Sequence, residues 1–368
     1  MKKEQIGYAE AEERTQPTPA GVVSKKRLAY IDYARGVGIL LMIMGHIGFG
    51  NVISKWMHAF HMPIFFIMSG YFFKERDNIL NAVVRKVKQL LVPYVLIGLI
   101  HFMIYVLMHM GESGIFEPLR NLFWVCTNLN MPIAGALWFL MCLFWVDVFF
   151  MLLYQYARKY LGIASGLIAL LGCMFPTLIH IRLPWAMDAA FVGVGFYFVG
   201  YTLKHHAEQR TVGRLMQLSL LESLIGFGVG TVLGLVNGAV NMRTGSYAVL
   251  PLSLLNACLL SICVINLCRV AEERYAKHPV IGKICGELQY IGENSIVYLC
   301  FNQLCILLIR KLPLGSLQFG RIMSFLICCV VLAVVMVILH NAVRLFENEH
   351  LKFLIGKDGV IPWQKRKA

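Results

Sequence analysis

The sequence predicts an all-α integral membrane protein with about ten transmembrane helices and both termini in the cytoplasm. Hydrophobic residues make up 58% of the 368 residues and charged residues only 15%, whereas a soluble domain carries about 25% charged residues. The mean hydropathy is +0.66. Apolar runs of roughly 18 residues or more, long enough to cross a bilayer as helices, recur along the whole chain.

These runs are separated by short polar gaps, of which 111–132 is semi-polar and is expected to hold an interfacial helix. The longest gap has about 25 residues, fewer than the roughly 50 of a small folded domain. Any functional site must therefore be built by the membrane helices and their short loops. The predicted spans are 33–51, 56–73, 89–110, 133–155, 160–180, 186–203, 218–240, 248–268, 295–309 and 322–343.

Lys and Arg residues are distributed unevenly between alternate gaps. Assigning both tails and the even-numbered gaps to one side places 27 of the 34 Lys and Arg residues there and 7 on the other side. Such an excess is typical of cytoplasmic segments. The net charge of +14 therefore reflects orientation in the lipid bilayer, and we expect no nucleic-acid partner.

Three parts are expected along the chain. Residues 1–26, rich in Glu, Gln, Thr, Pro and Lys, are expected to be a disordered cytoplasmic tail. Residues 27–346 form the transmembrane domain, and 347–368 a basic cytoplasmic tail. The eleven Cys residues lie mostly in predicted spans without a CxxC pair, so they are expected to pack as reduced thiols and not to bind metal.

The first two predicted spans carry ionisable residues where lipid-facing side chains are expected. Such a residue costs at least about 2.5 kcal/mol at bilayer depth and marks a candidate functional site. Asp32, Arg35 and His46 share one stripe of the first helix, because eleven residues at about 100° each return His46 to the azimuth of Arg35. His46 lies roughly 16 Å from Arg35, and His61 roughly 20 Å from Lys74 on the second span. Two imidazoles at similar depth are expected to line one cavity.

Two further residues belong to this level of the bilayer. Pro63 removes a backbone donor beside His61, so the second span is expected to loosen and to free carbonyl groups there. Asp147 falls at the same depth in the fourth span. It is expected to pair with a histidine, to mark a proton path, or to be a satisfied buried carboxyl group.

The same segments carry a recognisable pattern. Ten residues separate Arg35 from His46, and further segments follow at Phe60-His61-Met62-Pro63-Ile64-Phe65-Phe66, Ser69-Gly70-Tyr71, Leu91-Val92-Pro93-Tyr94, Leu137-Trp138-Phe139-Leu140 and Ile291-Gly292-Glu293-Asn294-Ser295. This pattern resembles the membrane acyltransferase-3 family, and within it the fucose 4-O-acetylase-like branch. The resemblance covers about residues 27 to 345, and the predicted span count fits the family's usual ten.

The resemblance implies an O-acetyltransferase of the inner membrane. The enzyme would move an acetyl group from cytoplasmic acetyl-CoA to a hydroxyl of a surface polysaccharide or lipid-linked glycan, with no permanently bound cofactor. His46 corresponds to the family's essential histidine and Arg35 to its partner arginine. The chemistry needs such groups, because a neutral imidazole can accept the proton of an attacking hydroxyl and an arginine can bind a phosphate by paired hydrogen bonds.

Other positions complete the candidate site. His61 is a second catalytic candidate, with capping of the broken backbone beside Pro63 as the alternative. The candidate acyl-donor residues near the cytoplasmic mouth are Arg35, Ser69, Lys74, Arg85 and Lys86. Supporting positions are Asp32, which is expected to pair with Arg35, Asp147, Asn302, and Trp138, for which an interface-belt position is the alternative.

One position departs from the family pattern. Seven residues past Ser295, where many relatives carry a histidine, this chain has Asn302. Asparagine forms hydrogen bonds but cannot take up a proton, so an acid or base role at this position is lost.

Alternatives remain at the level of mechanism and of function class. Direct transfer, with His46 activating the hydroxyl, and a relay through acetyl-histidine both fit the topology. Intramembrane His, Arg and Asp residues are also typical of transporters and flippases, although no inverted repeat is apparent in the sequence. A ligand-sensing membrane module is a third alternative.

Overall fold

The computed structural model describes residues 28–75, 78–110, 114–124, 135–310, 320–348 and 350–357. Within these ranges the regular structure is helical, apart from an isolated bridge between Asn241 and Ser246. The all-α prediction is confirmed. The predicted tail 1–26 lies outside the described residues, as does 358–368 of the predicted C-terminal tail.

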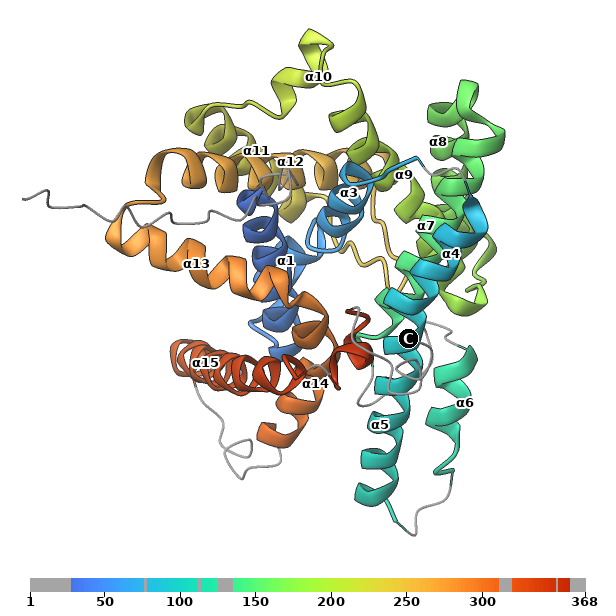
Figure 1. Cartoon of the computed structure of the whole chain (residues 1–368). Helices are drawn as coiled ribbons and strands as arrows, with labels where there is room; N and C mark the ends of the chain where they lie inside the picture. The colour runs from blue at the N-terminus through green and yellow to red at the C-terminus, as the bar shows by residue number, and fades with distance from the viewer. Residues whose placement is uncertain are drawn as a thin grey trace, which may run out of the picture.

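Short connections join successive helices (Figure 1). In chain order these are α1 (Ala29–Ile47), α2 (Asn51–His58), α3 (Pro63–Tyr71), α4 (Ile79–Lys86), η1 (Val87–Leu91), α5 (Val92–Met108), α6 (Glu117–Trp124), α7 (Trp138–Tyr156), η2 (Arg158–Tyr160), α8 (Leu161–Met174), η3 (Phe175–Ile179), η4 (Pro184–Ala186), α9 (Met187–His205), α10 (Arg210–Leu215), α11 (Leu220–Val236), α12 (Leu250–Tyr275), α13 (Pro279–Glu293), α14 (Ser295–Arg310), α15 (Arg321–Phe346) and η6 (Lys352–Ile355).

Six of the described helical runs are long and apolar enough to cross a membrane. The pair α13 and α14 gives a seventh if its two helices, bent by 87°, count as one span. The prediction of a multi-pass membrane protein is confirmed, while the count of ten and the cytoplasmic termini stay predictions. The six runs are Ile79–Met108, Trp138–Tyr156, Arg158–Ile179, Pro184–His205, Leu250–Tyr275 and Arg321–Phe346.

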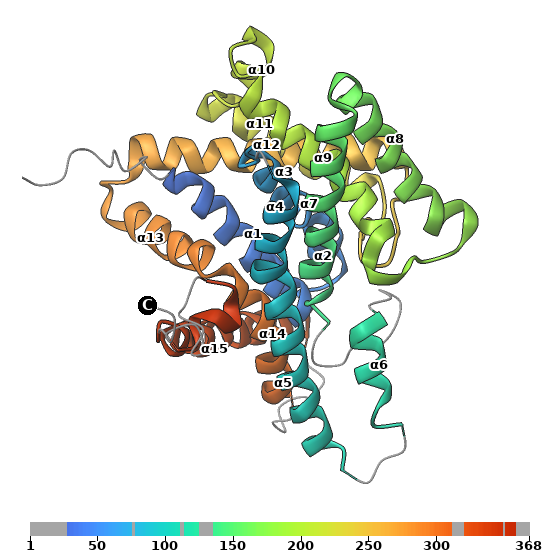
Figure 2. The same ribbon diagram turned by 45° about the vertical axis from the view of Figure 1, so that its right-hand side comes forward.

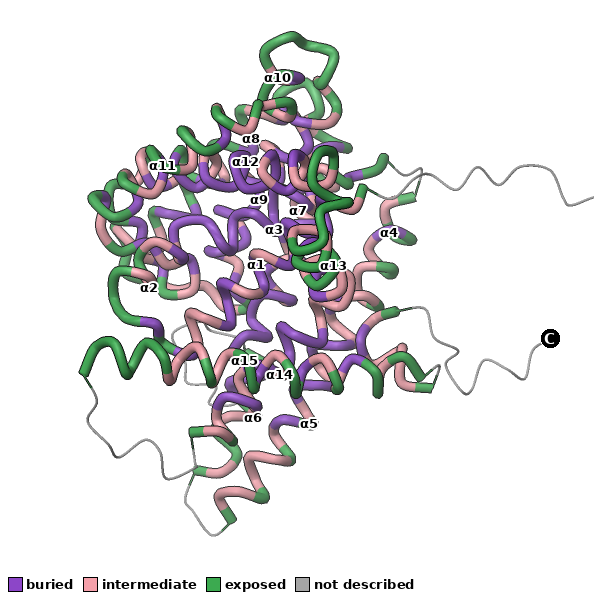
Figure 3. Tube along the Cα trace, turned by 90° about the vertical axis from the view of Figure 1, so that its left-hand side faces the viewer, coloured by how far each residue is buried: buried purple, intermediate pink, exposed green. Residues whose placement is uncertain are grey.

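Apolar side chains also cover much of the outer surface. Ile322 on α15 is 80% exposed and Val236 at the end of α11 is 78% exposed. Figure 3 shows the buried residues gathered around α1, α3 and α9, with exposed residues along α11 and α15. Since soluble monomers rarely expose large apolar patches, this surface is suited to lipid.

Helix α1 lies inside the bundle between α13 and α3, with α12 across one end (Figure 1, Figure 2). Two glycines bring α1 and α13 into backbone contact. A Cβ atom on Gly36 would lie 2.2 Å from the Leu288 carbonyl oxygen, and one on Gly292 only 2.0 Å from that of Asp32. Gly292 of the Gly-Glu-Asn-Ser segment therefore packs against the helical turn that carries Asp32 and Arg35.

The predicted second span, 56–73, is wrong as a single helix. It is broken into α2 and α3, with turns over 59–62. Pro63 begins α3 because it has no N–H to donate to a preceding carbonyl and its φ suits a first helical turn. The expected loosening beside His61 is thus observed, and it amounts to a complete break.

Helices α3 and α9 are held together by a second pair of glycines. A Cβ atom on Gly70 would lie 1.9 Å from the Tyr197 carbonyl oxygen, and one on Gly200 1.8 Å from that of Ile67. Only glycine permits such close backbone approach. This contact positions Ser69 beside the α9 turn that carries Tyr197.

Two predicted gaps contain helix. In the gap 111–132, α6 is observed, although its interfacial position stays a prediction. The gap 269–283 is mostly helical, because α12 continues to Tyr275 and α13 begins at Pro279. The His278 side chain starts α13 by accepting hydrogen bonds from the Val280 and Ile281 backbone amides.

Candidate active site

A cavity of about 320 Å³ opens where α1, α3, α4, α7 and α9 meet; we call it the donor cavity. Its lining contains all five candidate acyl-donor residues and one predicted supporting residue: Arg35, Ser69, Lys74, Arg85, Lys86 and Asp147. Four of these six side chains are basic. The cavity therefore presents a concentration of positive charge beside a hydroxyl group, which is suited to phosphate.

Arg35 reaches this cavity from the first half of α1. Its guanidinium donates to Asp32 Oδ1 at 3.3 Å, and its carbon lies 5.5 Å from the centre of the Phe72 ring. Asp32 is only 2% exposed. The predicted pair is thus observed, and the buried carboxylate together with Phe72 orients the guanidinium.

Asp147 pairs with a lysine and a tyrosine in the donor cavity, not with a histidine. Its carboxylate lies 2.8 Å from Lys86 Nζ, and it accepts a hydrogen bond of 2.9 Å from the Tyr197 hydroxyl. Of the three interpretations of Asp147, the geometry matches a satisfied buried carboxyl group. Sequence reasoning missed Tyr197, because one tyrosine in an apolar span carries no signal of this contact.

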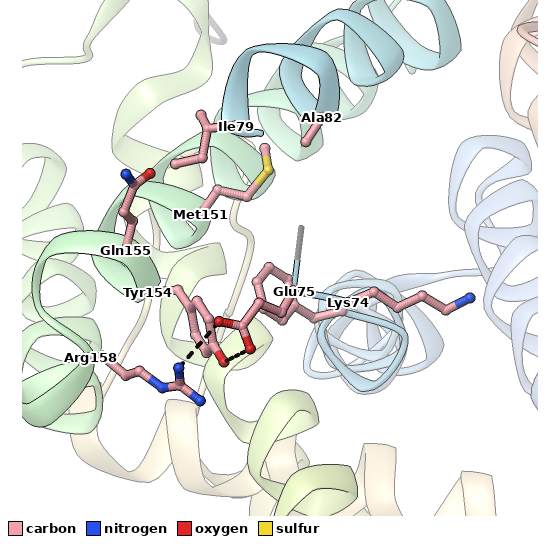
Figure 4. Close-up of a pocket in the computed structure, with 9 residues that line it drawn as sticks. Lys74, Glu75, Ile79, Ala82, Met151, Tyr154, Gln155 and Arg158 are labelled. Carbon is pink, nitrogen blue, oxygen red and sulfur yellow. Dashed lines mark hydrogen bonds and ion pairs between the residues drawn. The ribbon is translucent and has the colours of Figure 1, made fainter. Parts of the chain in front are cut away.

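A second group of charged and polar side chains, Glu75, Tyr154 and Arg158, lines a neighbouring pocket (Figure 4). The Glu75 carboxylate accepts from the Tyr154 hydroxyl at 2.9 Å and from Arg158 Nη1 at 3.2 Å. The Lys74 side chain extends away from this group. These bonds tie the segment after α3 to the end of α7, and they flank the donor cavity with a fixed carboxylate.

His46 lies near the opposite end of α1 and is bonded to Asn302 of α14. The distance between His46 Nδ1 and Asn302 Oδ1 is 2.6 Å. Asn302 is fully buried, and its amide nitrogen donates to the carbonyls of Tyr298 at 2.9 Å and Leu299 at 2.7 Å. Because both amide hydrogens are used, Asn302 presents its oxygen to His46, and this network assigns the proton to His46 Nδ1.

This tautomer has a chemical consequence. With Nδ1 protonated, Nε2 of His46 carries the free lone pair and can accept a proton from a hydroxyl or attack a thioester. Asn302 therefore orients the imidazole although it cannot titrate. The sequence singled out both residues but did not predict their contact.

Arg310 is a further residue that sequence reasoning missed. Its guanidinium donates to the carbonyls of His46 at 3.1 Å and Ile47 at 3.0 Å. These carbonyls belong to the last turn of α1, where they lack partners within the helix. Arg310 thus ties the end of α14 to the turn that carries His46.

His61 lies in the break between α2 and α3 and is 7% exposed. Its Nδ1 donates to the Met57 carbonyl at 2.9 Å, and its ring lies 4.9 Å from that of His58. This geometry matches the capping alternative, while a catalytic role for His61 stays a prediction. Among the described residues, no group of three or more His, Cys, Asp or Glu side chains is arranged to hold a metal ion.

Trp138 is buried inside the bundle. It begins α7 and is only 6% exposed, with its ring 6.2 Å from that of Phe139. Phe139 in turn lies 5.6 Å from Phe65 and 5.3 Å from Phe66 of α3. The Leu-Trp-Phe-Leu segment therefore packs into the core beside α3, which apolar spacing alone does not distinguish from a lipid-facing position.

Comparison with known protein families decides the class. Residues 28–341 match the acyltransferase-3 family, described as an acyltransferase domain. The chain belongs to the acyltransferase-3 family. Comparison with curated proteins and comparison with solved structures each gave no match. The chain is therefore a membrane acyltransferase, and its place in the fucose 4-O-acetylase-like branch stays a prediction.

In this acyltransferase, α1 connects the two parts of the candidate site. Arg35 lines the donor cavity, and His46 lies eleven residues further along, about 16 Å at the helical rise. His46 and His61 are not among the residues that line the donor cavity. The predicted residues thus divide into a basic group at one level of the bundle and a histidine group at another.

Replacing Asn302 tests its role as a positioning residue for His46. Asn302→Leu removes the oxygen that fixes the imidazole. We expect kcat to fall about 10–100-fold, the range seen when the hydrogen-bond partner that orients a metal-binding histidine is removed. KM for the acyl donor should change little, because Asn302 lies outside the donor cavity. Asn302→Asp retains an acceptor and should recover more activity than the leucine variant. Equal loss in both variants, or a selective rise in KM, would contradict this role.

Proposed function

We infer that this acyltransferase moves an acetyl group from cytoplasmic acetyl-CoA to a hydroxyl of a surface polysaccharide or lipid-linked glycan. One observation carries this proposal: the five residues singled out as acyl-donor contacts all line one cavity. They come from three separate segments of the chain. Their convergence is what a site for a polyanionic donor requires.

The elongated shape of the donor allows one end of α1 to bind its phosphates and the other end to hold its thioester. Acetyl-CoA carries its phosphates at one end and its thioester at the end of a long flexible arm. Phosphates held by Arg35, Arg85 and Lys86 would leave the arm to extend along α1 toward His46. A thioester at His46 Nε2 can then be attacked by a hydroxyl whose proton passes to the imidazole, with coenzyme A leaving as its thiol.

The alternative course uses His46 as the nucleophile. Nε2 attacks the thioester, coenzyme A leaves, and the acetyl-imidazole is then attacked by the acceptor hydroxyl. This relay allows donor and acceptor to visit the site from opposite sides of the membrane. Both courses need the lone pair on Nε2, which the bond from Nδ1 to Asn302 supports.

The proposed orientation puts the donor cavity on the cytoplasmic side of the inner membrane. The excess of Lys and Arg in alternate gaps supports this placement. Membership of the acyltransferase-3 family favours this function over a transporter, a flippase or a ligand-sensing module.

Transfer of labelled acetyl from acetyl-CoA to glycan tests the function. Membranes that contain the protein should incorporate label into glycan, and control membranes should not. Arg85→Ala should raise KM for acetyl-CoA about tenfold, since a hydrogen bond to a charged group contributes about 1.5–3 kcal/mol. Lys159→Ala is the matched control, because Lys159 lies outside the donor cavity and should leave KM unchanged.

Two results would contradict the proposal. Absence of label in the presence of a competent acceptor would favour transport or sensing. An equal change in KM for acetyl-CoA in Arg85→Ala and Lys159→Ala would show that the donor does not bind in this cavity.

A further inference from the structure

A second cavity of about 320 Å³ adjoins the donor cavity and shares Arg35 and Gln89 with it. Its far wall is the end of the described chain, Ile355, Gly356 and Lys357. We call residues 350–357 the C-terminal strap. In Figure 1 this segment, in red, lies between α14 and α5. Arg35 therefore lines both cavities, and the sequence predicted residues of the donor cavity only.

The C-terminal strap is held by specific contacts. Ile355 is 3% exposed. Gly356 has a φ of +67°, and a Cβ atom there would lie 2.5 Å from the Gln89 carbonyl oxygen. Lys357 Nζ donates to Asn294 Oδ1 at 2.8 Å. These contacts clip the strap to η1 and to the bend between α13 and α14.

The chain is locally irregular on both sides of the strap. Pro93 cannot donate to the carbonyl of Gln89 four residues earlier, and the helix there widens into the π-helical turn η1. On the other side, α13 and α14 are bent by 87°, and Asn294 lies at that bend. The strap therefore packs where two helices depart from regular geometry. Its binding surface is formed by η1 and by the bend between α13 and α14, which are far apart in the sequence.

The two cavities differ in chemistry. The donor cavity is dominated by basic side chains. The second cavity has apolar walls from Leu90, Ile296, Val297 and Ile355, and its polar groups are the amides of Gln89 and Asn294, the hydroxyl of Ser295, the carboxylate of Glu293 and the cations of Arg35 and Lys357. Apolar walls with a few placed polar groups are typical of small-molecule and cofactor sites. Arg35, at the junction, is the group best placed to bind a phosphate between them.

We propose that the second cavity binds the nucleotide end of the acyl-CoA donor, and that the end of the C-terminal strap that lines this cavity, Ile355 to Lys357, is part of the donor site. This inference rests on the proposed function. The purine lies between the apolar walls, with its polar edge toward the amides. Lys357 and Arg35 bind the phosphate nearest the nucleoside at the junction, the remaining phosphates lie in the donor cavity at Arg85 and Lys86, and the acyl arm then extends along α1.

Two variants of the full-length protein test this inference. Lys357→Ala removes the cation that lines the second cavity. Gly356→Ala displaces the strap, because alanine tolerates neither the φ of +67° nor the contact with Gln89. Lys352→Ala is the matched control, because Lys352 belongs to the strap but does not line the cavity. The ligand probe is adenosine 3′,5′-bisphosphate, which carries the nucleotide and no acyl arm.

We expect the wild type and Lys352→Ala to bind the probe, and the two test variants to bind it about tenfold more weakly. KM for acetyl-CoA should rise by a similar factor in the test variants with kcat little changed. KM for acetyl-phosphopantetheine, which lacks the nucleotide, should stay at its wild-type value.

Two outcomes would overturn the inference. One is unchanged probe binding in both test variants. The other is an equal rise in KM for both donors, which would make the strap a structural support only. Failure of the proposed function looks different: the wild type would show no acetyl transfer, yet it would still bind the probe in a manner that depends on Lys357.

Discussion

His46→Ala is expected to abolish acetyl transfer while the protein stays in the membrane at wild-type abundance. General acid–base catalysis by a positioned side chain contributes about 10²–10⁴-fold to a rate, and a histidine that also carries the acetyl group would cost more when removed. The measurement is incorporation of labelled acetyl into glycan, normalised to protein in the same membranes. The bond from Nδ1 to Asn302 is the physical reason, since it leaves Nε2 free to react.

His109→Ala provides the matched control. His109 is the residue that follows the last residue of α5, and its Nδ1 donates to the Tyr105 carbonyl at 2.9 Å. It lies at the end of α5, away from Asn302, and its loss should leave transfer at the wild-type rate. Full activity of His46→Ala, or equal loss in both variants, would remove His46 from the reaction.

The same preparation separates the two courses of transfer. Labelled acetyl-CoA without acceptor should leave label on the wild-type protein if acetyl passes through His46, and none if the hydroxyl attacks directly. His46→Ala should carry no label in either case.

Gly200→Ala is expected to cause a large loss of stability, because a Cβ atom there makes the closest approach to backbone among the described glycines. Its Cβ would lie 1.8 Å from the Ile67 carbonyl oxygen and 2.8 Å from the Tyr71 amide nitrogen. These are backbone atoms, so α3 and α9 must separate. Overpacking costs about 1–3 kcal/mol where side chains can adjust, and here we expect about 3 kcal/mol or more. The midpoint of thermal unfolding in detergent measures the effect.

Gly166→Ala is the control for this prediction. Gly166 lies on α8, which packs against α9, and a Cβ atom there meets nothing within 4 Å. Alanine should be neutral or stabilise the helix by up to about 1 kcal/mol. Equal unfolding midpoints for the two variants would show that the contact between α3 and α9 does not limit stability. Donor affinity should fall with Gly200→Ala, since Ser69 and Tyr197 both line the donor cavity.

The candidate site was predictable where its signal was local. The stripe of Asp32, Arg35 and His46 follows from helical periodicity, and the pair between Asp32 and Arg35 needs only a spacing of three residues. The convergence of Arg35, Ser69, Lys74, Arg85 and Lys86 on one cavity was predictable because these residues stand near one end of their spans. These features need no knowledge of which helices are neighbours.

Contacts across the bundle were not predictable in this way. Asn302 is 256 residues from its partner His46, and Asp147 binds Lys86 and Tyr197 although its depth also matched the histidines. The depth of a residue along its helix fixes only one coordinate of its position in the bundle. The other coordinates depend on how the helix is rotated and which helices are its neighbours. Residues of equal depth can therefore lie in separate parts of the bundle.

The sequence by itself determined the class of this protein, because an excess of apolar residues and the arrangement of its motifs are properties of the chain alone. It determined a multi-pass membrane acyltransferase with Arg35 and His46 on one face of one helix. Only the tertiary structure decided which distant residues meet there: glycines at positions 36, 70, 200 and 292 let backbones touch, the break before Pro63 turns the chain, and the C-terminal strap reaches Arg35. The physical reason is that composition and periodicity act along the chain, whereas close packing selects among helix arrangements that share the same composition and periodicity.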